Sequence, residues 1–234
     1  KKDLFVYLNE WLNSYISEEL KDLINLTNKD NKNRYVRAIA FRLYENNGIL
    51  KRFQVEDILK NILKDERKQF RSLGIKVGRY HVFLPKMLKP KAVELRILLW
   101  KFFNRISLNS EIPKSGLNFL KDDKSNFDRN FLLLCGFEKF KNFYIRVDIL
   151  EKLFIKIIEK SKNGKFETDS SMINLLGCTK ENFFQLMLLM NYKRDKKNVE
   201  NSFVYIGERK TKKIKKVLKS DRNPFKKLES LSLK

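Results

Sequence analysis

The fold is decided by residues 148–206, DILEKLFIKIIEKSKNGKFETDSSMINLLGCTKENFFQLMLLMNYKRDKKNVENSFVYI. The first apolar residues recur at every third or fourth position, which predicts an amphipathic helix. Gly164 then precedes a short strand, and Gly177 ends a short helix over 170–176 before a further helix begins at Lys180. Helix, strand, helix, turn and helix is the order in which a winged helix begins.

Capping residues and a final strand pair complete the pattern. Thr179 has the side chain of an N-cap, and Asp148 followed by Glu151 three positions later is typical of a capping box. Strands over 192–194 and 203–206 close a two-stranded wing with a basic loop between them. The stretch therefore predicts a winged-helix-like unit.

Outward from this stretch the chain has the periodicity of helices. We expect a long amphipathic helix over 3–25 and another that starts at Pro90. The expected buried stripe of the helix at Pro90 is Ala92, Leu95, Leu99, Phe102, Phe103 and Ile106. We therefore predict a mainly α, multi-helical protein with small β-hairpins and at least one winged-helix-like unit. Its expected parts are a helical N-terminal part with a basic hairpin, a linker, a winged-helix-like part and a basic tail, over residues 1–106, 107–127, 128–208 and 209–234.

Three short segments share one local pattern, in which an apolar helix ends at Gly or Asn before a strand-like pair. They are LGIK (73–76), CGFE (135–138) and MNYK (190–193). Two interpretations stay open. The pattern reflects either true repetition, with a first winged-helix-like unit over 35–84, or the ordinary need of helix-to-hairpin turns for Gly or Asn.

The segment RSLGIKVGRYHVFLPKMLKPKA, residues 71–92, departs from its surroundings and holds the single histidine of the chain. Apolar residues on both sides of Gly78 predict a tight hairpin. Basic side chains crowd this segment, and it contains no carboxylate. A basic hairpin with an aromatic residue is a candidate contact for a phosphate backbone. The candidate residues are Arg71, Lys76, Arg79, His81, Lys86, Lys89 and Lys91.

The net charge of +23 makes a polyanion the default partner. The excess is densest over 193–227, where fourteen basic side chains face four acidic ones. Such a segment has too few apolar residues to bury itself, and it is suited to contacts with phosphates. A nuclear-targeting signal is the competing interpretation. The candidate contacts are Lys193, Arg194, Lys196, Lys197, Arg209, Lys210, Lys212, Lys213, Lys215 and Lys216.

The block RKQFRSLGIKVGRYHVFLPKMLKPKAVELRILLW, residues 67–100, also carries a family resemblance. It resembles the region that follows the motor domains in alphaproteobacterial superfamily-two ATP-dependent helicases, which are related to the RNA helicase of the mitochondrial degradosome. Residues 135–153, 173–193 and 223–231 resemble the rest of that accessory region in the same order. The resemblance implies an RNA-binding accessory region, with RNA favoured over DNA and with motor domains in the same chain or in a partner chain.

The sequence contains no motif that indicates catalysis. An ATP-driven motor needs a glycine-rich phosphate loop that ends in Lys-Ser/Thr, but Gly164-Lys165 is followed by Phe166. Two cysteines and one distant histidine cannot supply a four-ligand zinc site, so we expect neither metal nor cofactor. Cys135 and Cys178 fit reduced core thiols. No secretory signal or long apolar run is found, which predicts no membrane association. The resemblance implies a bacterial cytoplasm, with a mitochondrial matrix as the alternative.

Together these observations predict a non-catalytic nucleic-acid-binding accessory region of an ATP-dependent RNA helicase, and not an enzyme in itself. Two alternatives stay open: a stand-alone basic interaction module associated with ribosomes or the nucleoid, and an enzyme with an unrecognised site. Phosphate contacts carry no information on the sugar, so the residues themselves do not distinguish RNA from DNA.

Overall fold

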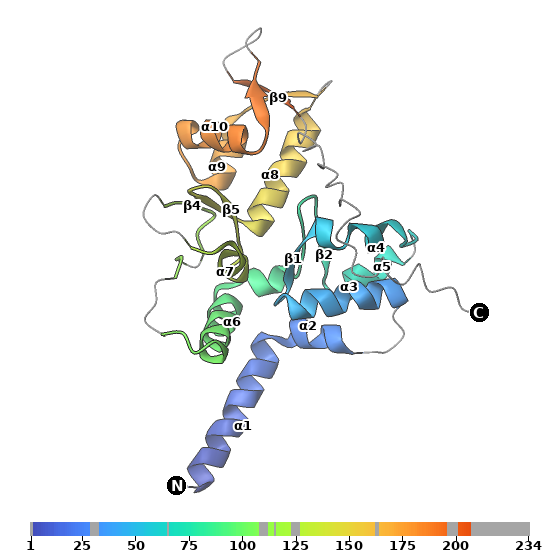
Figure 1. Cartoon of the computed structure of the whole chain (residues 1–234), viewed down its shortest axis with the longest axis vertical. Helices are drawn as coiled ribbons and strands as arrows, with labels where there is room; N and C mark the ends of the chain where they lie inside the picture. Colours follow the sequence, from blue (N-terminus) through green and yellow to red (C-terminus); the bar gives the residue numbers. More distant parts are fainter. Residues whose placement is uncertain are drawn as a thin grey trace, which may run out of the picture.

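A computed structural model of the chain describes residues 2–28, 33–64, 66–107, 112–114, 116–122, 127–161, 164–195 and 201–206. The described part is mainly helical, with three small three-stranded antiparallel sheets (Figure 1). This confirms the prediction of a mainly α fold with small β elements.

The described chain starts with a helical arm that extends away from the body of the molecule (Figure 1). The arm is α1 (Lys2–Glu19), whereas α2 (Lys21–Ile24) and the 3₁₀ turn η1 (Asn25–Thr27) that follow it belong to the body. The sequence predicts one helix over 3–25, but the helix is interrupted at Leu20, where φ is −105° and ψ is 17°. The interruption lets Leu20, Leu23 and Leu26 pack into the body, whereas most apolar residues of α1 remain exposed.

The first of three similar units follows the arm. Its sheet has the order β1-β3-β2, so the first strand pairs with the last. Val36, Ile39, Ala40 and Leu43 of the leading helix are fully buried, as the 3.6-residue period predicts, while Tyr44 is exposed. The elements are α3 (Arg34–Glu45), β1 (Ile49–Lys51), the 3₁₀ turn η2 (Arg52–Gln54), α4 (Glu56–Lys60), α5 (Arg67–Ser72), β2 (Lys76–Val77) and β3 (His81–Phe83).

The second unit has the same strand order, β4-β6-β5, with one helix fewer. Its leading helix begins at Pro90, as predicted. The expected linker over 107–127 is not only a linker, because Phe119 and Leu120 pair with a later strand of this unit. Four residues that the predicted stripe places in the core are exposed: Leu99, Phe102, Phe103 and Ile106. The elements are the 3₁₀ turn η3 (Pro85–Leu88), α6 (Pro90–Phe103), β4 (Phe119–Lys121), α7 (Arg129–Leu134), β5 (Phe137–Phe140) and β6 (Phe143–Arg146).

The third unit has the predicted winged-helix order, with the sheet β7-β9-β8. Gly177 ends the helix before the turn with φ of 70°, and the Thr179 hydroxyl accepts a hydrogen bond from the Asn182 N–H. The predicted capping box is wrong, because the helix starts after Arg146 and Asp148 forms an ion pair with that arginine. The elements are α8 (Val147–Lys160), β7 (Lys165–Glu167), α9 (Ser170–Leu176), α10 (Lys180–Leu189), β8 (Tyr192–Arg194) and β9 (Ser202–Tyr205).

The three units end their last helices in the same way. Gly74, Gly136 and Asn191 each follow such a helix with a positive φ, of 71°, 90° and 66°. Gly accepts this conformation without strain, and Asn is the residue that tolerates it best after Gly. The strand order is shared as well, so the sequence echo over 73–76, 135–138 and 190–193 lies at the same place in each unit, before the second strand of its sheet.

An apolar cluster joins the three units at the centre of the described structure. Ile49 and Phe83 come from the first unit and Val147 from the third, and all three are buried. Leu133 of the second unit packs against them. The three units therefore share one small apolar core, which fixes how they pack against each other.

Candidate nucleic-acid interface

A groove lined by residues of all three units lies beside the turn of the β2–β3 hairpin. We call this turn, residues 78–80, wing 1. The groove holds two adjoining cavities of about 550 and 290 Å³. Both cavities are lined by Phe53, Tyr80 and Tyr205. The larger is also lined by Arg52, Glu56, Arg79 and Phe154, and the smaller by Lys51, Arg129, Glu138 and Phe140.

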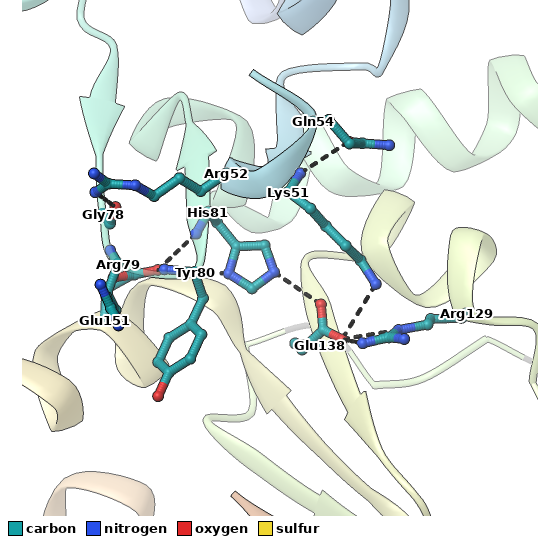
Figure 2. Close-up of polar contacts among 10 residues, drawn as sticks. All are labelled: Lys51, Arg52, Gln54, Gly78, Arg79, Tyr80, His81, Arg129, Glu138 and Glu151. Atoms are coloured by element: carbon teal, nitrogen blue, oxygen red, sulfur yellow. Dashed lines mark hydrogen bonds and ion pairs between the residues drawn. The ribbon is translucent and has the colours of Figure 1, made fainter. Parts of the chain in front are cut away.

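Wing 1 is held in place by a buried carboxylate of the third unit, as Figure 2 shows. The Arg79 N–H donates a hydrogen bond to Glu151 Oε2 at 2.5 Å. The N–H groups of Tyr80 and His81 donate to Glu151 Oε1 at 2.8 and 2.9 Å. A carboxylate with three backbone donors is strongly stabilised in its charged form. Glu151 therefore fixes the backbone from which Arg79 and Tyr80 reach the groove.

Arg52 holds the same turn from the opposite side. Its Nη1 donates to the Gly78 carbonyl oxygen, and its N–H donates to the Tyr80 carbonyl oxygen, both at 2.8 Å. A Cβ atom at Gly78 would collide with the Glu151 carboxylate. The glycine is thus required by the close approach of this side chain, which is a reason distinct from a positive φ.

A second buried carboxylate, Glu138 of β5, gathers three cationic groups (Figure 2). His81 Nε2 lies 2.8 Å from its Oε2, and Arg129 Nε donates to its Oε1 at 2.9 Å. Lys51 Nζ is 3.5 Å from Oε1. His81 Nδ1 lies 3.5 Å from Glu151 Oε1, outside hydrogen-bond geometry. One imidazole thus stands between carboxylates of the second and third units.

The network shifts the pKa values of its members in opposite directions. Burial alone favours neutral His81, but the hydrogen bonds and charges of Glu138 and Glu151 outweigh it and raise the pKa of the imidazole. Burial likewise opposes ionised Glu138, but His81, Arg129 and Lys51 lower its pKa to about 2. The pKa of Glu151 is lowered against the effect of burial by His81 and by the three backbone donors. Desolvation lowers the pKa of Lys51.

The structure separates the basic residues predicted in the hairpin segment. His81 is 1% exposed, so its prediction as a phosphate contact is wrong; its partners are the two buried carboxylates. Residues 71–92 contain no acidic residue, but the fold places acidic residues from other segments beside their basic side chains. Lys86 lies 2.9 Å from Asp22, and Lys91 is 3.9 Å from Glu19. The exposed members are Arg71, Lys76, Arg79, Lys86, Lys89 and Lys91.

Among the exposed basic residues of segment 71–92, Arg79 alone lines the groove. Lys193 and Arg194 are exposed on β8, where the Arg194 guanidinium lies 4.5 Å from the ring centre of Phe184. The other predicted contacts lie outside the described residues. They are Lys196, Lys197, Arg209, Lys210, Lys212, Lys213, Lys215 and Lys216.

Most groove residues escape prediction from the sequence. Phe53 is 71% exposed and Tyr205 is 44% exposed. They lie far apart in the chain, and an isolated exposed aromatic residue is an ordinary surface feature. Arg129 shows no local pattern that separates it from other surface arginines. The only local signal was the Arg79-Tyr80 pair within the predicted hairpin.

A second basic surface lies on α5, the helix that precedes wing 1. Its exposed residues include Arg67, Lys68 and Arg71. In a winged helix this position belongs to the recognition helix, which enters the major groove of a duplex. The corresponding helix of the third unit, α10, exposes one basic residue, Lys180, next to Glu181.

The comparisons with known proteins return nothing: no family model, no curated protein and no solved structure matches the chain. Within the described residues, no three His, Cys, Asp or Glu side chains are grouped so that they could hold a metal ion. Nor does any described helix have the length and apolar character that crossing a membrane requires.

Proposed function

We propose that the chain is a non-catalytic nucleic-acid-binding accessory module of an ATP-dependent RNA helicase, whose motor domains belong to the same protein or to a partner. The observation that supports nucleic-acid binding is the groove between the units. Cationic side chains of η2, wing 1 and α7 converge there with aromatic side chains of all three units. Positive charge beside aromatic rings is the composition of surfaces that bind nucleic-acid strands.

The helicase part of the proposal is supported by the family resemblance of residues 67–100 and of the three later segments. The repeated winged-helix-like architecture fits an accessory role, because such units hold strands while the chemistry takes place elsewhere. RNA is preferred over DNA on the resemblance alone. A bacterial cytoplasm or a mitochondrial matrix is proposed on the same basis.

A salt titration tests the binding of nucleic acid. The chain is titrated against a fluorescently labelled single-stranded RNA, and the slope of log K against log salt is measured. Each lost phosphate contact lowers the slope by about 0.7. We expect Arg79→Gln with Arg129→Gln to lower it by at most about 1.4, because Arg129 already shares Glu138. Lys60→Gln with Lys152→Gln, which replaces exposed lysines outside the groove, serves as the matched control. A wild-type chain that binds no RNA at low salt contradicts the proposal.

An ATPase assay tests the accessory role. The sequence lacks a phosphate loop, so the chain alone is expected to hydrolyse no ATP, with or without RNA. RNA-stimulated hydrolysis is expected only when motor domains accompany it. Turnover by the chain alone that disappears on mutation of one of its own residues would contradict a non-catalytic role.

The basic face of α5 favours a second candidate, a stand-alone module that packs on structured nucleic acid. If that candidate is correct, Arg67→Gln with Arg71→Gln weakens binding to an RNA or DNA duplex more than binding to a single strand. The groove variants then affect neither ligand, and no motor domain is needed for the function.

A further inference from the structure

We infer that the inter-unit groove binds one unpaired nucleotide, whose base stacks on Phe53 or Tyr205 while its flanking phosphates lie in the two cavities. The inference rests on the proposed nucleic-acid-binding function and makes the ligand specific: a single strand with accessible bases. It differs from a general attraction of phosphates, because it assigns affinity to aromatic side chains that carry no charge.

The arrangement of the groove supports this ligand. Phe53, Tyr80 and Tyr205 line both cavities and therefore lie between them. Each cavity adds two cations and one carboxylate: the larger is lined by Arg52, Arg79 and Glu56, and the smaller by Lys51, Arg129 and Glu138. Aromatic rings between two cationic cavities match the order phosphate, base, phosphate along a strand.

The exposure of the rings indicates a stacking surface and not a packed core. Phe53 keeps 71% of its surface and Tyr205 keeps 44%, although the groove offers apolar neighbours. The Tyr205 ring centre lies 5.2 Å from that of Tyr192, with the two rings tilted by 54°, so Tyr205 has an aromatic neighbour although nearly half of its surface is exposed. An unpaired base can cover such a ring, whereas bases within a duplex are stacked on each other.

The rigidity of wing 1 favours the same conclusion. Tyr80 and Arg79 project from a turn whose amide groups are bound by Glu151 and whose carbonyl groups are bound by Arg52. Their backbone is therefore ordered before a ligand arrives, which reduces the entropic cost of binding. The cavities, of about 550 and 290 Å³, are of the size that small ligands occupy.

The test compares three ligands of about 12 nucleotides: a single-stranded RNA, the same strand with abasic sites, and a blunt duplex. The variants Phe53→Ala and Tyr205→Ala are compared with Phe103→Ala, which removes a ring that is 86% exposed on α6. Stacking of one base corresponds to about 5-fold to 150-fold in affinity. We expect at least one of the two groove variants to lose that much for the single strand, with unchanged salt slope and unchanged binding to the abasic strand and the duplex.

Conservative replacements separate stacking from packing. Phe53→Tyr is expected to retain the affinity, whereas Phe53→Leu is expected to lose it, although both keep an apolar side chain at the site. A thermal unfolding curve for each variant reports on folding. Cross-linking with a strand that carries 5-iodouracil is expected to label the peptide containing Phe53 or Tyr205.

The outcomes distinguish this inference from the proposed function. If the aromatic variants bind all three ligands as the wild type does, while Arg79→Gln with Arg129→Gln lowers the salt slope, the stacking site is wrong and the function stands. If the wild type binds the abasic strand as tightly as the RNA, the site is also wrong. If the wild type binds none of the ligands, both proposals fail.

Discussion

Replacement of Glu151 by Gln removes the charge that holds wing 1 while the size of the side chain stays nearly the same. Glu151 accepts three hydrogen bonds from consecutive backbone N–H groups and lies 3.5 Å from His81 Nδ1. A glutamine offers one oxygen to these donors and turns its own NH₂ group toward the remaining one. At least one of these N–H groups therefore loses its acceptor, and the other two lose an ionised acceptor.

The cost follows from these contacts. A hydrogen bond to a charged group contributes about 1.5–3 kcal/mol, and a buried donor left without a partner costs a similar amount. For one lost and two weakened bonds we expect a loss of about 3 kcal/mol. In a protein of this size each kcal/mol lowers the melting temperature by about 2–4 °C, so the decrease is about 6–12 °C.

Thermal unfolding at pH 7 measures this decrease, with Glu159→Gln as the matched control. Glu159 is an exposed residue of the same helix, so its replacement tests the change of residue type alone. The loss of Glu151 also frees the turn that carries Arg79 and Tyr80, so we expect weaker binding of single-stranded RNA. A Glu151→Gln protein that melts within about 2 °C of the control would show that the turn is held by other contacts.

Three further predictions concern the same region and the repeated turns. Gly78→Ala places a Cβ against the Glu151 carboxylate and is expected to cost about 1–3 kcal/mol by urea unfolding, with less than additive effects in combination with Glu151→Gln. His81→Gln is expected to destabilise most between the ordinary pKa values of 4.5 and 6.5. The pKa of the imidazole is raised, so its contribution to folding stability is complete below pH 6.5 and is lost as pH rises through the folded-state pKa. The pKa values of Glu138 and Glu151 are lowered, so their contribution to stability is complete above pH 4.5 and is lost as pH falls through their folded-state pKa values. Stability measured against pH should show the difference from the wild type shrink in alkaline solution. Gly74→Ala is expected to cost about 1–2 kcal/mol for its left-handed backbone, and Gly136→Ala more, because a Cβ there also lies 2.9 Å from a leucine of η3.

Local signals in the sequence predicted the third unit closely. Ser170–Leu176 and Tyr192–Arg194 have the expected bounds, because Gly177 and the turn at Asn191 act on their immediate neighbours. The N-cap at Thr179 is of the same kind, since its hydrogen bond reaches only three residues. Where a neighbouring residue determines the end of a helix or strand, the sequence pattern was sufficient to predict that end.

Long-range partners explain what the sequence did not reveal. Glu151 matches a capping box, yet its carboxylate binds amides 70 to 72 positions away. His81 appeared to stand in a segment free of acidic residues, but Glu138 reaches it from β5. The arm shows the same limit, because periodicity predicts an apolar face whether or not a partner covers it.

The groove implies a division between attraction and selection. Lys51 and Arg129 already share Glu138, and Arg52 already holds the Gly78 carbonyl oxygen, so these cations offer a strand only part of their charge. The large positive excess of the chain lies mostly elsewhere and acts over longer distances, which raises the rate of encounter with any polyanion. What the groove adds is geometry: aromatic rings lie between the two cavities, beside a turn that Glu151 and Arg52 hold in place. If charge attracts the strand and the groove selects unpaired bases, raising the salt concentration weakens the binding of all nucleic acids to a similar degree. The ratio of affinities for unpaired and paired bases is then expected to persist.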